Sequence, residues 1–303
     1  MTVLETDLAP AGPRVSRLVM GLWRVVSWHL SDQELLDLIH VCLDMGITTF
    51  DLADIYGDYA CEEIFGRALA LEPGLRERLQ LVTKCGIKLV SDRRPRHRLK
   101  HYDTSLVHIL ASVEHSLRML NTDRLDLILI HRPDPLMDAA EVANAFRQLR
   151  GSGQVLHFGV SNFSPSQFDL LASRLDFPLV TNQVEISVLE MDVLDDGTVD
   201  QCQRMGISPM AWSPLAGGRL FGDGDPQAER VREALVEVGE QLGGATVDQV
   251  ALAWLLRHPA RIVPILGSGK IDRLRRAVGA FEHQLSRQQW FTIWTASKGH
   301  EVP

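Results

Sequence analysis

Four polar side chains stand at or just beyond the ends of short apolar segments in this 303-residue chain. They are an acid, a phenol, a lysine and a histidine: Asp51, Tyr56, Lys84 and His131. A free phenol has a pKa of about 10, too high for easy proton exchange at neutral pH, and a nearby ammonium lowers it by stabilising the phenolate. We expect Lys84 to act on Tyr56 in this way. Asp51 would hold Lys84 charged, and His131 would share a hydrogen bond at the same oxygen.

Such a group would form a general acid whose proton reaches a carbonyl oxygen while negative charge builds there. This suits reduction of a carbonyl, and in that role the loss of Asp51 should cost activity more than stability. Two of the residues also have a structural alternative, Asp51 as a cap of the following helix and His131 as a hydrogen-bonded core residue. A different catalytic alternative is a Schiff base at Lys84, as in an aldolase.

Apolar segments recur along the chain with helical patterns between them. Most are nearly continuous in apolar residues, which is typical of parallel strands buried on both faces. We expect eight strands, over residues 17–22, 47–52, 79–84, 125–131, 155–161, 179–183, 207–213 and 262–268. Alternating strands and helices in this number predict a (β/α)8 TIM barrel, whose active sites lie at the carboxyl ends of the strands. The alternative is an open doubly wound sheet, but the sequence lacks the GxGxxG fingerprint that would open a helix after an early strand.

The intervening helices have their own start and stop signals. Ser31 and Glu34 form a capping box, a stripe of apolar residues follows, and Gly46 is placed to end the helix. Similar patterns predict helices over residues 104–121, 139–150, 165–174, 195–205, 230–242 and 246–257, and an extra C-terminal helix after Ser286. Residues 3–15, with Ala11, Gly12 and Pro13 as the turn, predict a hairpin that covers the bottom of the barrel. We expect residues 1–303 to form a single barrel domain.

Composition narrows the classes of function. A net charge of −8 argues against binding to nucleic acid, which requires a basic face. No apolar run approaches the ~20 residues that cross a bilayer, and the acidic N-terminus does not resemble a secretory signal. We therefore expect a cytoplasmic protein without a membrane segment. The four cysteines form no CxxC pair and no zinc spacing, so we expect reduced thiols and no metal site: Cys42, Cys61, Cys85 and Cys202.

The stretch GITTFDLADIYG at residues 46–57, followed by Glu62, Glu63 and Gly66, resembles the signature of the aldo-keto reductase superfamily. The resemblance continues in family order through LVTKCGI, LDLILIHRPDP, HFGVSNFSP, TNQVEIS, AWSPLAGG and PILGSGKIDRLR. HRPDPLMDA and RQQWF resemble bacterial members that are described only as oxidoreductases.

The resemblance implies reduction of an aldehyde or ketone by direct hydride transfer from NADPH, with Tyr56 as proton donor in a tetrad with Asp51, Lys84 and His131. It implies that the nicotinamide carboxamide meets Ser161, Asn162 and Gln183, and that its ring stacks on Trp212. The pyrophosphate would follow Ser213, Pro214, Leu215, Gly217 and Arg219, and the adenosine 2′-phosphate would meet Ser268, Lys270 and Arg273. Gly267 stands where many members carry a basic residue, so NADH is an alternative donor. Some relatives bind the cofactor and serve chiefly as regulatory partners, which is a non-enzymatic alternative.

The substrate is expected to be a small carbonyl compound. Trp23 and Trp28, in the loop after the first strand, would wall an apolar pocket. The chain's basic cluster, RRPRHRLKH at residues 93–101, follows the third strand and hence lies on the active-site face. It is either a solvated loop or a segment that attracts anionic carbonyl compounds through Arg94 and Arg96.

Overall fold

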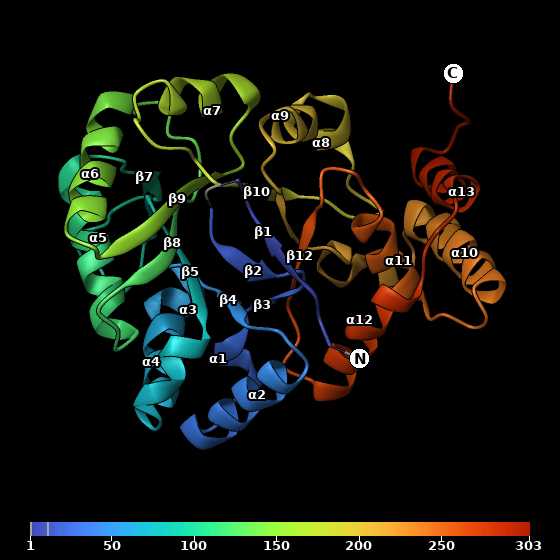
Figure 1. The fold of residues 1–303 in the computed structure, drawn as a ribbon, viewed down its shortest axis with the longest axis horizontal. Helices are drawn as coiled ribbons and strands as arrows, with labels where there is room; N and C mark the ends of the chain where they lie inside the picture. Colours follow the sequence, from blue (N-terminus) through green and yellow to red (C-terminus); the bar gives the residue numbers. More distant parts are fainter. Residues whose placement is uncertain (1, 11) are drawn as a thin grey trace.

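A computed structural model, which describes residues 2–10 and 12–303, shows eight parallel strands closed into a barrel with helices around it (Figure 1). Around the barrel the strands follow the order β10, β11, β12, β3, β4, β5, β8 and β9. Barrel strands that are consecutive in the sequence are therefore also adjacent in the barrel. Their bounds are β3 Val19–Gly21, β4 Thr49–Asp51, β5 Gln80–Cys85, β8 Leu125–Ile130, β9 Val155–Ser161, β10 Asn182–Glu185, β11 Met210–Trp212 and β12 Val263–Leu266. The (β/α)8 prediction is confirmed.

Each expected apolar segment supplies a barrel strand, with differences only in the bounds. The largest concerns β10, which was expected at residues 179–183 and instead occupies Asn182–Glu185. Leu179 and Val180 are buried, and the N–H of Val180 donates to the Phe158 carbonyl. The segment before β10 is therefore packed against β9, and the apolar run extends beyond the regular ladder.

The principal helices pack outside the strands (Figure 1). They are α2 Asp32–Asp44, α4 Cys61–Ala70, α5 Leu106–Met119, α6 Ala139–Gly151, α7 Pro165–Ala172, α9 Thr198–Met205, α10 Pro226–Gln241, α11 Val247–Leu256, α12 Ile271–Gly279 and α13 Arg287–Lys298. Short helical turns join them: α1 Val25–Trp28, α3 Tyr56–Tyr59, α8 Asp192–Asp195, η1 Pro73–Arg78, η2 Ala216–Phe221 and η3 Ala280–Glu282. No helix in the described ranges has the length and apolarity to cross a membrane.

The helix signals in the sequence correspond to the observed ends. Ser31 and Glu34 form the expected capping box, and Gly46 follows the helix with a φ of 80°, a backbone angle that glycine adopts without strain. The Thr246 box and the helix after Ser286 are also confirmed. The sequence analysis gave no helix for α4, although its buried residues Cys61, Phe65, Ala68 and Leu69 have helical spacing.

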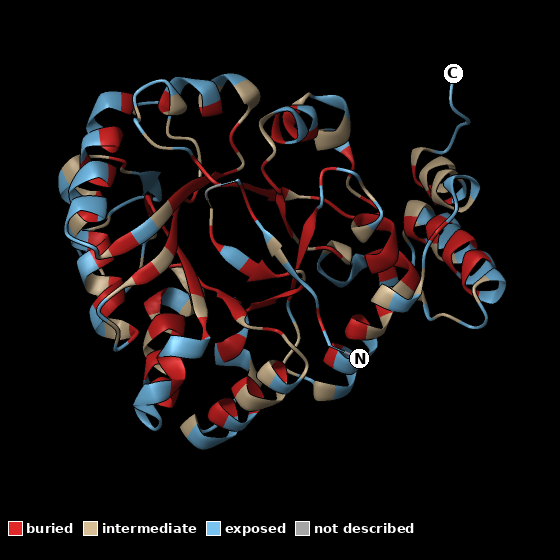
Figure 2. Cartoon of the chain, viewed as in Figure 1, coloured by how far each residue is buried: buried red, intermediate tan, exposed pale blue. Residues whose placement is uncertain are grey.

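The barrel strands are almost wholly buried, as Figure 2 shows, because helices cover their outer faces. A second apolar cluster lies at one side, where α10, α11 and α13 pack together. There Trp254 and Trp290 stack with ring centroids 4.6 Å apart, and each indole N–H donates to the other's backbone carbonyl. The four cysteine thiols are free and buried.

Two antiparallel ribbons stand outside the barrel. The first pairs β1 Glu5–Asp7 with β2 Arg14–Ser16. Backbone hydrogen bonds tie it to residues that precede barrel strands, from the Val3 N–H to the Met45 carbonyl and from the Ser208 N–H to the Leu8 carbonyl. The expected hairpin therefore covers the amino-terminal mouth of the barrel, although Ala11 in its expected turn lies outside the described residues. The second ribbon pairs β6 Ile87–Lys88 with β7 His101–Tyr102 and was not anticipated.

A close contact between α4 and the end of α5 makes Gly66 sensitive to substitution. A Cβ at Gly66 would lie 1.9 Å from the carbonyl oxygen of Met119, so Gly66→Ala must push the helices apart. We expect it to lower the free energy of unfolding by about 2 to 3 kcal/mol. Gly74→Ala is the matched control, because a Cβ there meets no atom within 4 Å. Equal unfolding free energies for the two variants in urea titrations would contradict this packing.

Candidate active site

An ion pair between Lys84 and Asp51 lies at the carboxyl ends of β5 and β4, which are neighbours in the barrel. The Lys84 ammonium is 2.7 Å from Asp51 Oδ1 and also donates to the Leu52 carbonyl at 2.6 Å and to Tyr56 Oη at 3.1 Å. The side chains are 0% exposed for Lys84 and 4% for Asp51. Each of the three N–H donors of the ammonium thus has an acceptor, as a buried charge requires.

The electrostatics of this group follow from burial and from the pair. Burial works to lower the pKa of Lys84, but the Asp51 carboxylate and the Tyr56 oxygen outweigh it and hold that pKa above its ordinary value. For Tyr56 the balance differs from the sequence expectation. Lys84 lowers the pKa of the phenol as expected, yet burial raises it by more, so the pKa of Tyr56 lies above its ordinary value. The phenol is therefore protonated at neutral pH, which is the form that a proton donor needs.

His131 faces Tyr56 from the end of β8. The two rings meet edge to face with centroids 5.7 Å apart. Burial, with Lys84 and Arg132 nearby, holds the pKa of His131 well below its ordinary value, so the imidazole is neutral. Its Nδ1 atom is buried and has no hydrogen-bond partner in the part of the chain that the structure describes. A neutral imidazole beside the phenol can donate one hydrogen bond to an oxygen that both groups share.

Gln183 on β10 joins the ion pair from across the barrel. Its Nε2 donates to Asp51 Oδ2 at 2.8 Å, so Asp51 is held by Lys84 on one oxygen and by Gln183 on the other. The resemblance assigned Gln183 to a nicotinamide carboxamide. In this structure one N–H of its side-chain amide donates to Asp51, and its side-chain carbonyl oxygen is an acceptor that could meet a carboxamide N–H.

Three expected cofactor residues form a connected chain. The Asn162 side chain donates to Ser161 Oγ at 2.6 Å and accepts from the Trp212 indole N–H at 3.0 Å. Ser161 Oγ in turn donates to the backbone carbonyl of Gln183 at 2.8 Å. Asn162 and Trp212 also line a cleft of about 440 Å³ whose walls include Glu185. These contacts fix the face of the indole beside a space large enough for a small ligand.

Arg132, the residue after His131, was not identified from the sequence. Its guanidinium lies 5.5 Å from the Trp212 ring centroid and donates to the His131 carbonyl at 3.0 Å and to Ser161 Oγ at 3.4 Å. Burial lowers its pKa, while Tyr56 and Glu185 act in the opposite direction. The signal was available, because Arg132 stands directly after a strand-end histidine in the HRPDP motif.

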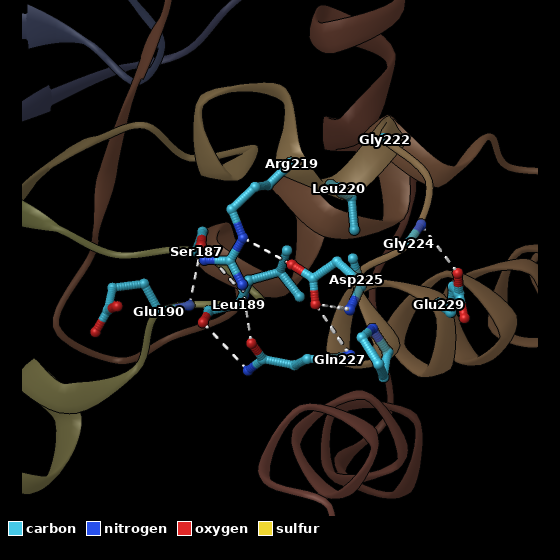
Figure 3. Close-up of polar contacts among 12 residues, drawn as sticks. Ser187, Leu189, Glu190, Arg219, Leu220, Gly222, Gly224, Asp225, Gln227 and Glu229 are labelled. Carbon is cyan, nitrogen blue, oxygen red and sulfur yellow. Dashed lines mark hydrogen bonds and ion pairs between the residues drawn. The ribbon is translucent and has the colours of Figure 1, made fainter.

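The loop after β11 places its expected residues in different surroundings. Pro214 is buried, and Leu215 packs partly against the apolar core. The Gly217 carbonyl accepts a hydrogen bond at 3.1 Å from Arg24, in the loop after β3. Arg219 is directed toward the start of α10, where it bonds Asp225 at 2.8 Å and Gln227 at 3.1 Å (Figure 3).

Ser213, the first residue of that loop, has a φ of 50° and its carbonyl accepts from the Ala216 N–H. The residues expected to meet the adenosine 2′-phosphate lie in and beside the loop after β12. Ser268 Oγ accepts from the Lys270 N–H at 3.2 Å, and Lys270 and Arg273 are exposed at the start of α12.

Of the two expected pocket tryptophans, Trp28 packs on Gly269, where a Cβ would lie 2.6 Å from its ring. Trp28 therefore borders the loop that carries Ser268 and Lys270. Trp23 is 58% exposed, with the Arg24 guanidinium 5.1 Å above its ring. That Trp23 and Trp28 wall an apolar substrate pocket stays a prediction.

Two buried acids lie behind the tetrad. Glu62 accepts a hydrogen bond from Thr83 at 2.6 Å, and Asp54 accepts one from Ser112 at 2.9 Å. Burial raises the pKa of Glu62 to about 7 and that of Asp54 to about 8, and the Glu62 carboxylate adds to the rise for Asp54. Asp54 is therefore a neutral carboxyl group at neutral pH.

Comparison with known proteins places the chain among oxidoreductases. The Aldo/keto reductase family model matches residues 17–297. The oxidoreductase YdhF of Escherichia coli (strain K12) is 53% identical over 99% of this chain and all of its own length, which confirms the expected likeness to bacterial members that are described only as oxidoreductases. A 6-dehydroglucose reductase of Agrobacterium fabrum is 47% identical over 95% of this chain and 96% of its own. The crystal structure of the thermostable aldo-keto reductase Tm1743 with the inhibitor epalrestat superposes with a TM-score of 0.82, at 29% identity over 97% of this chain and 99% of that one.

The raised pKa of Asp54 predicts a particular dependence of stability on pH. The folded protein keeps a proton on Asp54 up to about pH 8, whereas the unfolded chain releases it above about pH 4. Stability is therefore lost as pH rises between these values, and Asp54→Asn removes that loss. We expect the Tm of Asp54→Asn, relative to the wild type, to increase by at least about 2 °C from pH 5 to pH 8. Asp58→Asn, at an exposed position in the same turn, should show a constant difference; a constant difference for Asp54→Asn as well would contradict a neutral buried carboxyl.

Proposed function

Since the chain belongs to the aldo/keto reductase family, we propose that it reduces an aldehyde or ketone to the alcohol with NADPH, and that Tyr56 is the proton donor. The chain is an oxidoreductase that acts on carbonyl and alcohol groups with a nicotinamide cofactor. The observation that carries the finer proposal is the contact of Tyr56 Oη with the buried ammonium of Lys84, at 3.1 Å.

The chemistry follows from what each side chain can hold. When bound, the reduced nicotinamide supplies a hydride to the carbonyl carbon. Tyr56, protonated at neutral pH, donates a hydrogen bond and then its proton to the carbonyl oxygen as charge builds there. Lys84 stabilises the phenolate that remains, and Asp51 and Gln183 keep Lys84 in place. His131, as a neutral imidazole, donates to the same oxygen and orients it.

Several contacts support a nicotinamide site beside Tyr56. The Trp212 indole N–H is bonded to Asn162, Asn162 is bonded in turn to Ser161, and Gln183 Oε1 is an acceptor for a carboxamide. Ser268, Lys270 and Arg273 would meet the adenosine 2′-phosphate, since a hydroxyl and two cations give charge-assisted bonds there. Gly267 is exposed and supplies no charge, so NADH remains an alternative cofactor.

A Schiff-base mechanism fits the geometry poorly. Nucleophilic attack by Lys84 requires a neutral, accessible amine. Lys84 is 0% exposed and is held by three acceptors, and the pair with Asp51 raises its pKa above the ordinary value. The amine is therefore charged and covered, which favours an electrostatic role.

The substrate class we propose is a polyhydroxylated aldehyde. The relative named 6-dehydroglucose reductase supports this class. So does the cleft beside Trp212, because Asn162, Ser164, Gln167, Glu185 and Glu190 line it and offer hydrogen-bond partners for hydroxyl groups. A site built to hydrogen-bond the hydroxyls of a substrate discriminates against analogues that lack them, since its polar groups then lose their partners.

Replacement of the phenol tests the proton donor. In Tyr56→Phe the ammonium of Lys84 keeps Asp51 and the Leu52 carbonyl as partners, so the protein should fold and bind NADPH. We expect kcat for aldehyde reduction to fall by about 10³-fold. Tyr59→Phe is the matched control, because Tyr59 lies in the same turn and its hydroxyl accepts from the Leu89 N–H, away from the ion pair. Full turnover in Tyr56→Phe would show that another group donates the proton.

A pair of three-carbon aldehydes tests the substrate class. We expect kcat/KM for D-glyceraldehyde to exceed that for propionaldehyde by about tenfold or more, because the hydroxyls of the former pair with the cleft. Glu185→Ala should lower the first value and leave the second unchanged. Equal kcat/KM values for the two aldehydes would contradict the proposed substrate class and would not contradict carbonyl reduction.

A further inference from the structure

A second cleft, of about 300 Å³, lies between the turn at residues 54–59, the β6–β7 ribbon and α5. None of the four tetrad residues, all of which the structure describes, lines it. The basic segment at residues 93–101, which the proposed reduction does not use, forms one of its walls.

Basic side chains reach the cleft from the basic segment, the ribbon and α5. Arg94 and His97 come from the basic segment, Lys88 comes from β6, and α5 contributes His108, His115 and Arg118. Lys88, Arg94 and Arg118 are permanent cations, and Asp54 is the acidic group among the lining residues. The composition of the wall therefore favours an anionic ligand.

Arg94 is the cation best placed for a ligand. Its guanidinium lies 4.6 Å from the ring centroid of Tyr59, and its Nη2 is 3.1 Å from His115 Nε2. It contacts no carboxylate within hydrogen-bond distance in the described part of the chain. The other two permanent cations are already paired, Lys88 with Asp103 and Arg118 with Glu114. The basic segment is thus folded onto the cleft, and Arg94 retains N–H donors that no acid uses.

Two polar atoms at the cleft support a ligand independently of charge. Asp54 is 7% exposed, and its Oδ1 atom is buried without a hydrogen-bond partner among the described residues. His108 Nε2 is likewise buried without a hydrogen-bond partner among the described residues. An unpaired buried polar atom costs about 1 to 3 kcal/mol, so a ligand that pairs with either one recovers part of that cost. Because Asp54 is protonated at neutral pH, its carboxyl group can donate to an anion.

We propose that this cleft is a binding site for a phosphoryl group, either inorganic phosphate or a phosphate monoester, held by Arg94 with His108 and His115. Donors approach from three elements, which suits the several oxygens of a phosphoryl group better than the two coplanar oxygens of a carboxylate. Asp54 and Tyr59 flank Tyr56 in the chain, so an occupant contacts the same turn that carries the proposed proton donor.

Binding at this cleft should take up protons. Burial lowers the pKa of His115 and brings that of His108 to about 4, with Arg94 acting on the first and Lys88 on the second. A bound dianion favours the protonated imidazoles, so affinity rises as pH falls. The other charged or titratable groups around the cleft are Asp54 and Tyr59 from the turn, Glu63 from α4, His97, His101 and Asp103 from the ribbon segment, and Arg118 from α5.

Calorimetric titration of the full chain, saturated with NADP+ so that the cofactor's own phosphate site is filled, tests the proposal. Inorganic phosphate and glucose 6-phosphate are the two probes, and glucose is the neutral control. We expect one site, tighter at pH 6.5 than at pH 8.5, and about tenfold weaker binding in Arg94→Gln. Arg96→Gln removes an exposed charge from the same segment and should bind as the wild type does. Tighter binding of glucose 6-phosphate than of phosphate would identify the monoester as the ligand, and the reverse would identify inorganic phosphate.

The proposal would be overturned if neither probe gave a saturable heat of binding. It would also be overturned if Arg94→Gln and Arg96→Gln lost affinity equally, since net charge alone would then explain binding. His115→Asn, whose side chain keeps one hydrogen-bonding group, serves as the second variant if Arg94→Gln melts early. It should weaken binding and flatten its pH dependence. The titration does not depend on turnover, so its failure leaves the proposed reduction untouched.

Discussion

The buried ion pair between Lys84 and Asp51 is the interaction on which the candidate active site depends. An ammonium that is 0% exposed is tolerated because three acceptors surround it, and a break in such a pair costs about 3 to 5 kcal/mol. Asp51 is also bonded by Gln183 from the far side of the barrel. The closed barrel brings β4, β5 and β10 close enough for these side chains to meet. That the loss of Asp51 costs activity more than stability stays a prediction, and its two buried partners indicate that it contributes to stability as well.

The pair also governs Tyr56, through a competition of two effects. Burial disfavours the phenolate, and Lys84 favours it. Burial is the larger effect, so the phenol is protonated at neutral pH. In the reaction we propose, Lys84 would act after the proton has left Tyr56, by stabilising the phenolate. The expectation of a lowered phenol pKa considered the charge alone, and it was wrong in direction because the sequence does not report how much water the site excludes.

Much of this arrangement could be predicted because parallel strands place their carboxyl ends at one mouth. The continuous apolar runs predicted the eight strands, and the residues that end three of them predicted that Asp51, Lys84 and His131 would meet. Contacts made across the barrel or through side-chain rotation were not predictable in the same way. The bonds from Gln183 to Asp51 and from Arg219 to Asp225 are two such contacts.

The turn that carries Tyr56 contributes residues both to the candidate active site and to the second cleft. Gly57, Asp58 and Tyr59 have φ values of 58°, 56° and 65°, and a side chain costs about 1 to 2 kcal/mol in this region. The surrounding contacts must offset that cost: Tyr59 accepts from the Leu89 N–H and lies under Arg94, and Asp54 is bonded to Ser112. The strained backbone directs Tyr56 toward Lys84 while Asp54 and Tyr59 line the second cleft on the outer side. Contacts made by the ribbon and α5 outside the barrel therefore hold the phenol in place inside it.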